Sequence, residues 1–313
     1  MISIIWRILF TLSILANIFL FLMLIAFSLI FSTGQRGFYV EDVIRDGSST
    51  NKIAIIRLEG IIDGRMSNDI HKQIKAAKED KNVKAVIIRT ISPGGTVAAS
   101  DRIHHEITKF RKETGKPVVS FMQTVAASGG YYTSVACDKI ISEPTAITGS
   151  IGVISNHLVI KQLLEEKLGI NPVVVKSGEK KDWPSIFSET TEEQKQYLHD
   201  RLINPAYERF AQLVADGREM LSESEVKELA DGGIYGAPEA LEKKLIDRIG
   251  YIEEAIALTE ALTGIKGMQV IEYSKPFSLS SMLISQSSSL LKIDRELLEK
   301  LVTPQLLYLW DVR

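Results

Sequence analysis

Two short segments of the sequence contain residue types that could perform acyl-transfer chemistry. The segment SPGG at residues 92–95 follows an apolar run, and its glycines let the backbone turn sharply and direct N–H groups to one point. The segment AASGGYY at 126–132 places Ser128 among small residues, so that a substrate carbonyl can approach its hydroxyl and the Gly129 N–H can stabilise an oxyanion. Ala126 stands where the G-x-S-x-G pattern requires glycine. A plain strand-to-helix turn and a close-packed helix start are the alternative interpretations.

A nucleophilic serine needs a base, and the sequence offers few candidates. It contains five histidines, none in a glycine-flanked loop, and a triad through His157 is the histidine alternative. A lysine can act as a base only when it is neutral, and burial favours the neutral form. The segment KSGEKKDW at 176–183 follows an apolar run and supplies Lys176, Lys180 and Lys181, among which the residues alone do not choose.

A third segment, TGSIGV at residues 148–153, could orient such a lysine. The hydroxyl of Ser150 would hold a neutral lysine in place by a hydrogen bond. The alternative interpretation is a β-bend whose glycines allow tight packing.

Composition argues against several other kinds of site. The 37 basic and 39 acidic residues give a net charge of −2, so the chain has no basic excess for binding nucleic acid. The single cysteine, Cys137, cannot form an internal disulfide or a cysteine-rich zinc site, and we interpret it as a small buried side chain. Composition therefore argues against a nucleic-acid binder and against a cysteine-rich metal site.

The elements that must position these residues alternate between apolar strands and amphipathic helices. Strands are predicted at 52–60, 84–90 and 117–122, with helices at 67–80 and 97–114 between them. This alternation is typical of right-handed βαβ units in a mostly parallel sheet. Further along, the pattern predicts a helix at 128–136, short strands at 138–142 and 145–148, a helix at 158–168, a strand at 171–176, and helices at 191–216, 223–230, 237–245 and 251–263.

The mean hydropathy of +0.07 is positive because of one N-terminal segment. No charged residue occurs from Ile8 to Ser32, and as a helix this segment would extend roughly 37 Å, enough to cross a hydrocarbon core. We predict an uncleaved membrane anchor, and a cleaved signal peptide is the alternative. Arg7 mildly favours a cytoplasmic N-terminus, which would place the rest of the chain on the extracytoplasmic side of the cell membrane.

These features divide the chain into four expected parts. They are an anchor at 1–32, a linker at 33–51 rich in Gly, Ser, Thr and Asp, an α/β domain at 52–265 and a C-terminal extension at 266–313. The extension holds a serine-rich stretch followed by IDRELLEKL and LLYLW, for which we predict no structure.

In combination, these segments resemble the signal peptide peptidase A family of membrane-anchored serine proteases. The resemblance covers residues 52 to 265 and rests on SPGG, GKPVV at 115–119, AASGGYY, ACDKI at 136–140, TGSIGV, KSGEKKD at 176–182 and ADG at 230–232. Each segment is weakly informative alone, whereas all of them in this order at the family's spacing form a strong signal.

The resemblance implies an α/β fold of the ClpP/crotonase-like type, with repeated ββα units preceded by one N-terminal transmembrane helix. It also implies a Ser-Lys dyad. Ser128 would be the nucleophile. Lys181 would be the general base because the family's lysine lies three residues after the glycine of KSG. Lys180 stays open as the alternative, since the spacing from Ser128 to Lys181 is one residue longer than expected.

The resemblance also implies roles for the other two segments. Gly129 and Gly94, or Gly95 in place of Gly94, would supply the oxyanion N–H groups, and Ser150 would orient the lysine. The expected activity is that of an endopeptidase that degrades remnant signal peptides or other membrane-released or unfolded peptides, as a homo-oligomer enclosing its active sites. The implied Ser-Lys mechanism needs neither a metal nor a cofactor.

Two other functions remain as alternatives. A catalytically inactive, membrane-anchored scaffold could keep this fold. An acyl-CoA hydratase or isomerase could share it, but such an enzyme needs an acid/base carboxylate, and none stands beside SPGG or ASGGY in the sequence.

Overall fold

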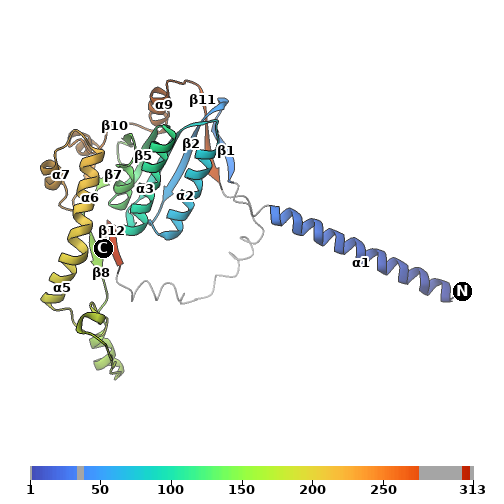
Figure 1. The fold of residues 1–313 in the computed structure, drawn as a ribbon, viewed down its shortest axis with the longest axis horizontal. Coiled ribbons are helices and arrows are strands. Elements are labelled where there is room, and N and C mark those ends of the chain that lie inside the picture. Colours follow the sequence, from blue (N-terminus) through green and yellow to red (C-terminus); the bar gives the residue numbers. More distant parts are fainter. Residues whose placement is uncertain (1, 34–38, 275–304, 311–313) are drawn as a thin grey trace. The chain divides into compact units, whose positions relative to one another are not determined.

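The computed structural model describes residues 2–33, 39–274 and 305–310 (Figure 1). The chain divides into two units, and helix α1 (Ile2–Thr33) makes up most of the first. Within it, Ile4–Phe27 has a mean hydropathy of 2.7 and no buried side chains. The helix is therefore long and apolar enough to cross a membrane, as predicted, although a signal sequence would share these properties.

The second unit is built around a largely parallel sheet with the strand order β1-β11-β2-β3-β5-β6-β10. Strands β2, β3, β5 and β6 pair in parallel, which confirms the predicted α/β class. Because the strands are parallel, SPGG after β3 and Ser128 after β5 reach the same edge of the sheet. The bounds are β1 (Val40–Arg45), β2 (Ser48–Glu59), β3 (Val83–Ser92), β5 (Val118–Ala127), β6 (Lys139–Ser142), β10 (Arg248–Ile249) and β11 (Met268–Ser274).

Helices cover both faces of this sheet. Helix α2 (Gly64–Glu79) packs beside α3 (Val97–Thr114) and against β2, as Figure 1 shows. Helix α9 (Ile252–Thr263) packs against β3 and β5, where Ile53, Ile87 and Phe121 join it in one core cluster. The intervening strand residues, such as Ala54 and Ile88, are also buried. Burial on both faces explains why these strands are apolar runs without alternation.

Short elements at the edge of the sheet form the surroundings of Ser128. Helix α4 (Gly129–Ser134) begins directly after it, and β7 (Ile147–Gly149) pairs in parallel with the last residues of β5. β9 (Ile234–Gly236) pairs antiparallel with β7. The helical region from 192 to 217 runs without a break through α5 (Glu192–Leu198), the π-helix η3 (His199–Ile203) and α6 (Asn204–Gly217), which confirms the long helix predicted at 191–216. Helices α7 (Glu223–Leu229) and α8 (Ala237–Glu242) follow.

A smaller sheet of three strands lies beside this edge. Strand β12 (Gln305–Leu309) lies between β4 (Gly94–Thr96) and β8 (Ile154–Asn156) and pairs antiparallel with both. Residues 305–309 are therefore paired with the segment that carries SPGG, more than 200 positions earlier in the sequence. Figure 1 shows β12 next to β8, although the two are far apart in sequence.

Several segments differ from the prediction. The stretch 33–51, expected to be a linker, contains β1 and the first residues of β2. Their partner is β11, which inserts between them from the far end of the chain, so no local signal marks them. Strand β11 falls within the expected C-terminal extension at 266–313. It was not predicted as a strand, because its partners β1 and β2 lie far away in the sequence. The IDRELLEKL segment lies outside the described residues.

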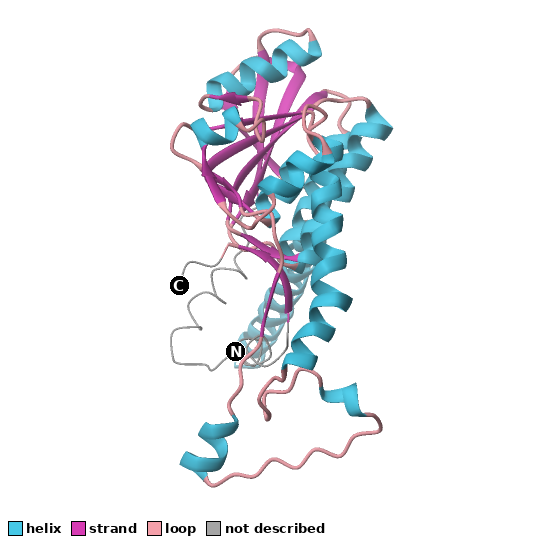
Figure 2. Cartoon of the chain, turned by 90° about the vertical axis from the view of Figure 1, so that its left-hand side faces the viewer, coloured by secondary structure: helices cyan, strands magenta, loops and turns pink. Residues whose placement is uncertain are grey.

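The predicted strand at 171–176 is wrong. Val173 and Val175 are 88% and 95% exposed, and the segment belongs to neither sheet, so it has no partner strand for its backbone. The preceding helix is confined to 161–168 and is mostly a π-helix, η1 (Leu163–Lys167). Figure 2 shows this extension, residues 157–190, as a long excursion away from the sheet.

Candidate active site

Ser128 lies at the sharp turn between β5 and α4. Its backbone has φ 52° and ψ −111°, a conformation that non-glycine residues seldom adopt and that clusters at functional sites. Two hydrogen bonds hold the turn: the Ser128 N–H donates to the Gly149 carbonyl, and the Tyr132 N–H donates to the Ser128 carbonyl, both at 2.8 Å. The Ser128 side chain does not cap the helix. Ser128 thus lies at a strained strand-to-helix turn, as the serine of a nucleophile elbow does, and the residue is 1% exposed.

The glycines of SPGG approach this turn at backbone distance. A Cβ added to Gly94 would lie 2.8 Å from the Gly129 nitrogen, and a Cβ added to Gly129 would lie 3.1 Å from the Gly95 nitrogen. Gly94 also has a φ of 106°, which only glycine adopts readily. The Gly94 N–H already donates to Ser92 Oγ at 3.0 Å. The Gly94 N–H is therefore already engaged by a side chain.

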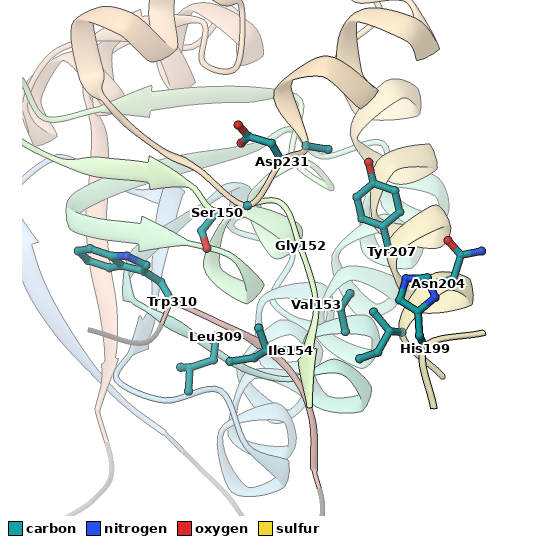
Figure 3. Close-up of a pocket in the computed structure, with 13 residues that line it drawn as sticks. Ser150, Gly152, Val153, Ile154, His199, Asn204, Tyr207, Asp231, Leu309 and Trp310 are labelled. Carbon is teal, nitrogen blue, oxygen red and sulfur yellow. The ribbon is translucent and has the colours of Figure 1, made fainter. Parts of the chain in front are cut away.

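Strand β7 brings Ser150 beside the same turn. Gly149 pairs with Ala127, and Ser150 follows with φ 49° and an N–H that donates to the Gly233 carbonyl at 2.6 Å. A Cβ on Gly149 would lie 2.5 Å from the Tyr235 ring, so this glycine is needed for the close packing. In Figure 3 the Ser150 hydroxyl points into a pocket.

The lysine-bearing segment is not part of this cluster. Lys181 lies in the short 3₁₀-helix η2 (Glu179–Asp182) of the extension, and its side chain is exposed. Lys180 lies over the rings of Trp183 and Tyr197, with its Nζ 5.2 and 4.5 Å from the ring centroids. Lys176 forms an ion pair with Asp182 at 2.7 Å. Within the part of the chain that the structure describes, no hydrogen bond or ion pair joins any of these lysines to Ser128.

The histidines also have other partners. His157 Nε2 is 2.7 Å from Thr190 Oγ1 within the extension, which gives it a structural contact away from the turn. His104 packs edge-on against the ring of Tyr132, 5.4 Å between centroids, and burial lowers the pKa of His104 to about 4. His199 of η3 lines the pocket beside Ser150, although its sequence context carries no signal of a site.

That pocket has a volume of about 550 Å³ (Figure 3). It is bounded by the segment after Ser150, by the start of α6 with Tyr207, by Asp231, and by Trp310 at the end of β12. Among the described residues, no group of three or more His, Cys, Asp or Glu side chains is arranged to hold a metal ion. Cys137 is buried, and burial raises the pKa of its thiol, which agrees with its interpretation as a packing residue.

An aromatic cluster lies beside the elbow. Tyr132, one turn of helix after Ser128, stacks on Tyr308 of β12, with 4.8 Å between ring centroids. Phe210 of α6 packs against both rings. No local pattern marks this cluster, because its members come from segments far apart in the chain and Tyr308 lies in a region without a predicted structure.

The Tyr132 hydroxyl is hydrogen-bonded to one of a pair of charged side chains. It donates to Asp101 at 2.7 Å, and Asp101 also accepts from Arg209 at 2.6 Å. Burial opposes ionisation of Asp101, but the hydrogen bonds from Tyr132 and Arg209 outweigh it and hold the pKa of Asp101 below its ordinary value. The Tyr132 ring is thereby held in a defined orientation.

Comparisons with known proteins identify the family of the chain. Residues 110–266 match the model of peptidase family S49, a stretch that includes Ser128, Ser150 and the three lysines. A putative signal peptide peptidase SppA from Enterococcus faecium is 38% identical over 244 residues, covering 74% of this chain and 70% of that protein. Protease 4 from Haemophilus influenzae is 36% identical over 219 residues, covering 68% of this chain and 35% of that protein.

Among solved structures, a ClpP1 variant from Listeria monocytogenes aligns with a TM-score of 0.44 and 18% identity, covering 66% of this chain and 95% of that one. The family match spans half of the chain, and it agrees with the resemblance carried by the sequence segments. The chain belongs to peptidase family S49, whose members are serine-type peptidases.

Proposed function

We propose that this chain is a membrane-anchored serine endopeptidase that uses Ser128 as its nucleophile and cleaves remnant signal peptides or similar peptides at the membrane. The observation that carries this proposal is the strained turn at Ser128, with φ 52°, packed against the backbone of Gly94 and Gly95. The printed name of the Enterococcus faecium relative supports the substrate class. The apolar helix α1 would keep the enzyme close to such substrates.

The oxyanion would be stabilised by the N–H groups of Gly129 and Gly95. Gly129 follows the nucleophile and begins α4, and Gly95 N lies close to Gly129. Gly94 is the weaker candidate because its N–H is engaged by Ser92 Oγ. Its role would be steric, since any side chain there would collide with the Gly129 nitrogen. Backbone donors fixed in this way need no rearrangement when charge develops.

Lys181 would be the general base, with Lys180 as the alternative. The contacts of Lys180 with Trp183 and Tyr197 favour Lys181, whose side chain is free to reach another surface. Because the extension holds Lys181 away from Ser128, we propose that the site is completed by a second copy of the chain. Exposed apolar side chains of the extension, among them Leu168, Val173 and Val175, support a homo-oligomer. Burial in that interface would favour a neutral lysine.

The reaction would then proceed through an acyl-enzyme. Ser128 Oγ attacks the peptide carbonyl while neutral Lys181 Nζ accepts the hydroxyl proton, and the tetrahedral oxyanion accepts hydrogen bonds from the backbone N–H groups. Lys181 returns the proton to the leaving amine as the C–N bond breaks. In the second half, Lys181 Nζ accepts a proton from water as the water oxygen attacks the acyl carbon. Lys181 then returns this proton to Ser128 Oγ as the ester bond breaks and the acid product leaves. Ser150, beside the turn, would orient Nζ through its hydroxyl.

The single apolar helix is compatible with one membrane anchor. We propose that the peptidase unit lies on the extracytoplasmic side, which the position of Arg7 before the apolar segment supports. No observation favours the scaffold or the acyl-CoA enzyme over this function.

The test is hydrolysis of a mixed peptide library by the full chain in detergent. Replacing Ser128→Ala or Lys181→Ala should lower kcat by at least about 10³-fold, because nucleophile and base act as a unit. Lys180→Ala and the exposed Ser224→Ala serve as matched controls and should stay within a few-fold of the wild type. Full activity of Ser128→Ala would overturn the proposal, and loss of activity in Lys180→Ala alone would transfer the role of base to Lys180.

A further inference from the structure

The segment that follows β2 is hydrogen-bonded to the segment that carries SPGG. The Ile62 N–H donates to the Gly94 carbonyl, and the Thr96 N–H donates to the Ile62 carbonyl, both at 2.8 Å. A Cβ added to Gly95 would lie 2.0 Å from the Ile62 carbonyl oxygen, so the two backbones are in close contact. Residues 60–62 therefore help to fix the path of the chain through SPGG.

These bonds set the direction of the Gly95 N–H, one of the two proposed oxyanion donors. In a planar trans peptide, the carbonyl of one residue and the N–H of the next point in opposite directions. Because the Gly94 carbonyl points to Ile62, the Gly95 N–H points away from Ile62. The Gly129 backbone lies close by, since a Cβ added to Gly129 would be 3.1 Å from the Gly95 nitrogen. A rotation of the Gly94 peptide would therefore redirect the Gly95 N–H.

The Ser92 hydroxyl makes hydrogen bonds to both of these segments. It donates to the Gly60 carbonyl at 2.6 Å and accepts from the Gly94 N–H at 3.0 Å. A hydroxyl has one proton and two lone pairs, so it can make both bonds at once. Ser92 is fully buried and pairs with Ala126 of β5, two residues before Ser128. The hydroxyl thus links the end of β2 to SPGG beside the proposed nucleophile.

Loss of the Ser92 hydroxyl would leave the Gly94 N–H without its acceptor. Gly94 is buried, and a buried N–H without a partner is costly, so the backbone would move to find another acceptor. Gly94 has a φ of 106° and no side chain to restrict it, which makes such a rotation easy. The Gly95 N–H would move with it, because the two residues share a peptide group.

We propose that Ser92 is a positioning residue of the peptidase and that its hydroxyl keeps the Gly95 N–H directed at the oxyanion. The inference rests on the proposed function. Ser92 acts through the Gly60 carbonyl and the Gly94 N–H, and the reaction does not consume or protonate it. Its contribution belongs to the transition state, because the oxyanion forms there and is absent from the bound peptide. Its loss should therefore lower kcat and leave KM unchanged.

The first experiment measures kcat and KM of the full chain in detergent for one fluorogenic peptide that the wild type hydrolyses. Ser92→Ala should lower kcat at least about tenfold, because one oxyanion donor contributes about 10²-fold or more. The KM of this variant should stay within about twofold of the wild type. Ser92→Cys fills the same space with a weak donor and acceptor, so its kcat should fall as well.

Ser120→Ala is the matched control for the loss of a buried hydroxyl. Ser120 is also fully buried, near the start of β5, and its hydroxyl donates to Ser134 Oγ at 2.8 Å. This variant loses a hydrogen bond away from SPGG and should keep kcat within a few-fold of the wild type. Unchanged kcat in Ser92→Ala, or an equal fall in Ser120→Ala, would overturn the proposal.

Inhibitor binding separates a misdirected donor from a damaged binding groove. In the complex with a peptide aldehyde, Ser128 Oγ bonds to the aldehyde carbon and the aldehyde oxygen takes up the proton that Oγ loses, so this oxygen lies where the oxyanion would form. Ser92→Ala should raise the Ki of the aldehyde at least about tenfold. The matching peptide acid forms no adduct, and its Ki should stay within about twofold. An equal rise for both ligands would show a structural role and overturn the proposal.

Hydrogen exchange keeps failure of this inference distinct from failure of the peptidase function, because it needs no turnover. In the full chain, mass spectrometry should find faster exchange at residues 91–97 in Ser92→Ala than in the wild type, with residues 67–79 of α2 unchanged. Faster exchange in a chain that cleaves no peptide would support the hydrogen bonds of Ser92 and refute the peptidase. Serine-dependent cleavage by Ser92→Ala at the wild-type rate would support the peptidase and refute the positioning role.

Discussion

Ser128 and the two glycines beside it show how strongly individual residue types constrain this site. Ser128 has a backbone conformation that costs energy, and the hydrogen bonds from its own N–H and from Tyr132 hold it there. Gly94 and Gly95 are needed because other backbone atoms occupy the space where a Cβ would stand. These residue types could be recognised in the sequence because each is chemically or sterically unusual where it stands.

Replacing Gly95 tests this constraint. A Cβ there would lie 2.0 Å from the Ile62 carbonyl oxygen, so Gly95→Ala must shift the strand that carries the proposed oxyanion donor. Because a displacement of about 1 Å can cost about 10²-fold in rate, we expect kcat to fall by at least that factor. Gly64→Ala is the control, since nothing lies within 4 Å of its added Cβ and activity should persist. Unchanged kcat in Gly95→Ala would remove the glycine from the site.

At the scale of elements, the sequence predicted what local patterns determine. The helix at 97–114 and the strands at 52–60 and 84–90 were found because apolar periodicity and capping residues are local signals. Strands β1, β11 and β12 were missed because their partners lie far away in the chain. The strand predicted at the apolar run 171–176 is wrong, because a β-prone sequence forms no strand without a partner strand.

The packing of α3 against α4 gives a prediction about pH. Burial lowers the pKa of His104 to about 4 from an ordinary 6.5, so the folded chain keeps it neutral while the unfolded chain protonates it. Its contribution to stability is complete above pH 6.5 and is lost as pH falls toward 4. The urea midpoint of unfolding, followed by tryptophan fluorescence, should therefore fall less steeply across this pH window in His104→Gln than in the wild type. His105→Gln, exposed on the same helix, should leave the decline unchanged, and an equally steep decline in His104→Gln would refute the assignment.

At the scale of the whole molecule, the peptidase unit contains the proposed nucleophile and the proposed backbone donors, but it holds the proposed base in an exposed extension. Sequence order alone could not reveal this, because spacing in the chain does not fix distance in space. The exposed valines of the extension support the proposed assembly, in which the extension of one copy would reach another. The apolar helix would gather copies on one membrane and raise their local concentration.

Mixing two inactive variants tests the assembly. If Lys181 acts on the Ser128 of another copy, combining Ser128→Ala chains with Lys181→Ala chains should restore a substantial fraction of wild-type hydrolysis, because some sites then contain both groups. Each variant alone, at the same total concentration, should stay inactive. A mixture no more active than its components would show that the lysine does not cross between copies.

The identity of the nucleophile is the central claim, and covalent labelling tests it most directly. A fluorophosphonate reacts with an activated serine hydroxyl, so peptide mass spectrometry of the labelled full chain should find the adduct on Ser128, with no adduct in Ser128→Ala and much slower labelling in Lys181→Ala. An adduct on a different residue, or a labelled chain that still hydrolyses peptides at the full rate, would contradict the account.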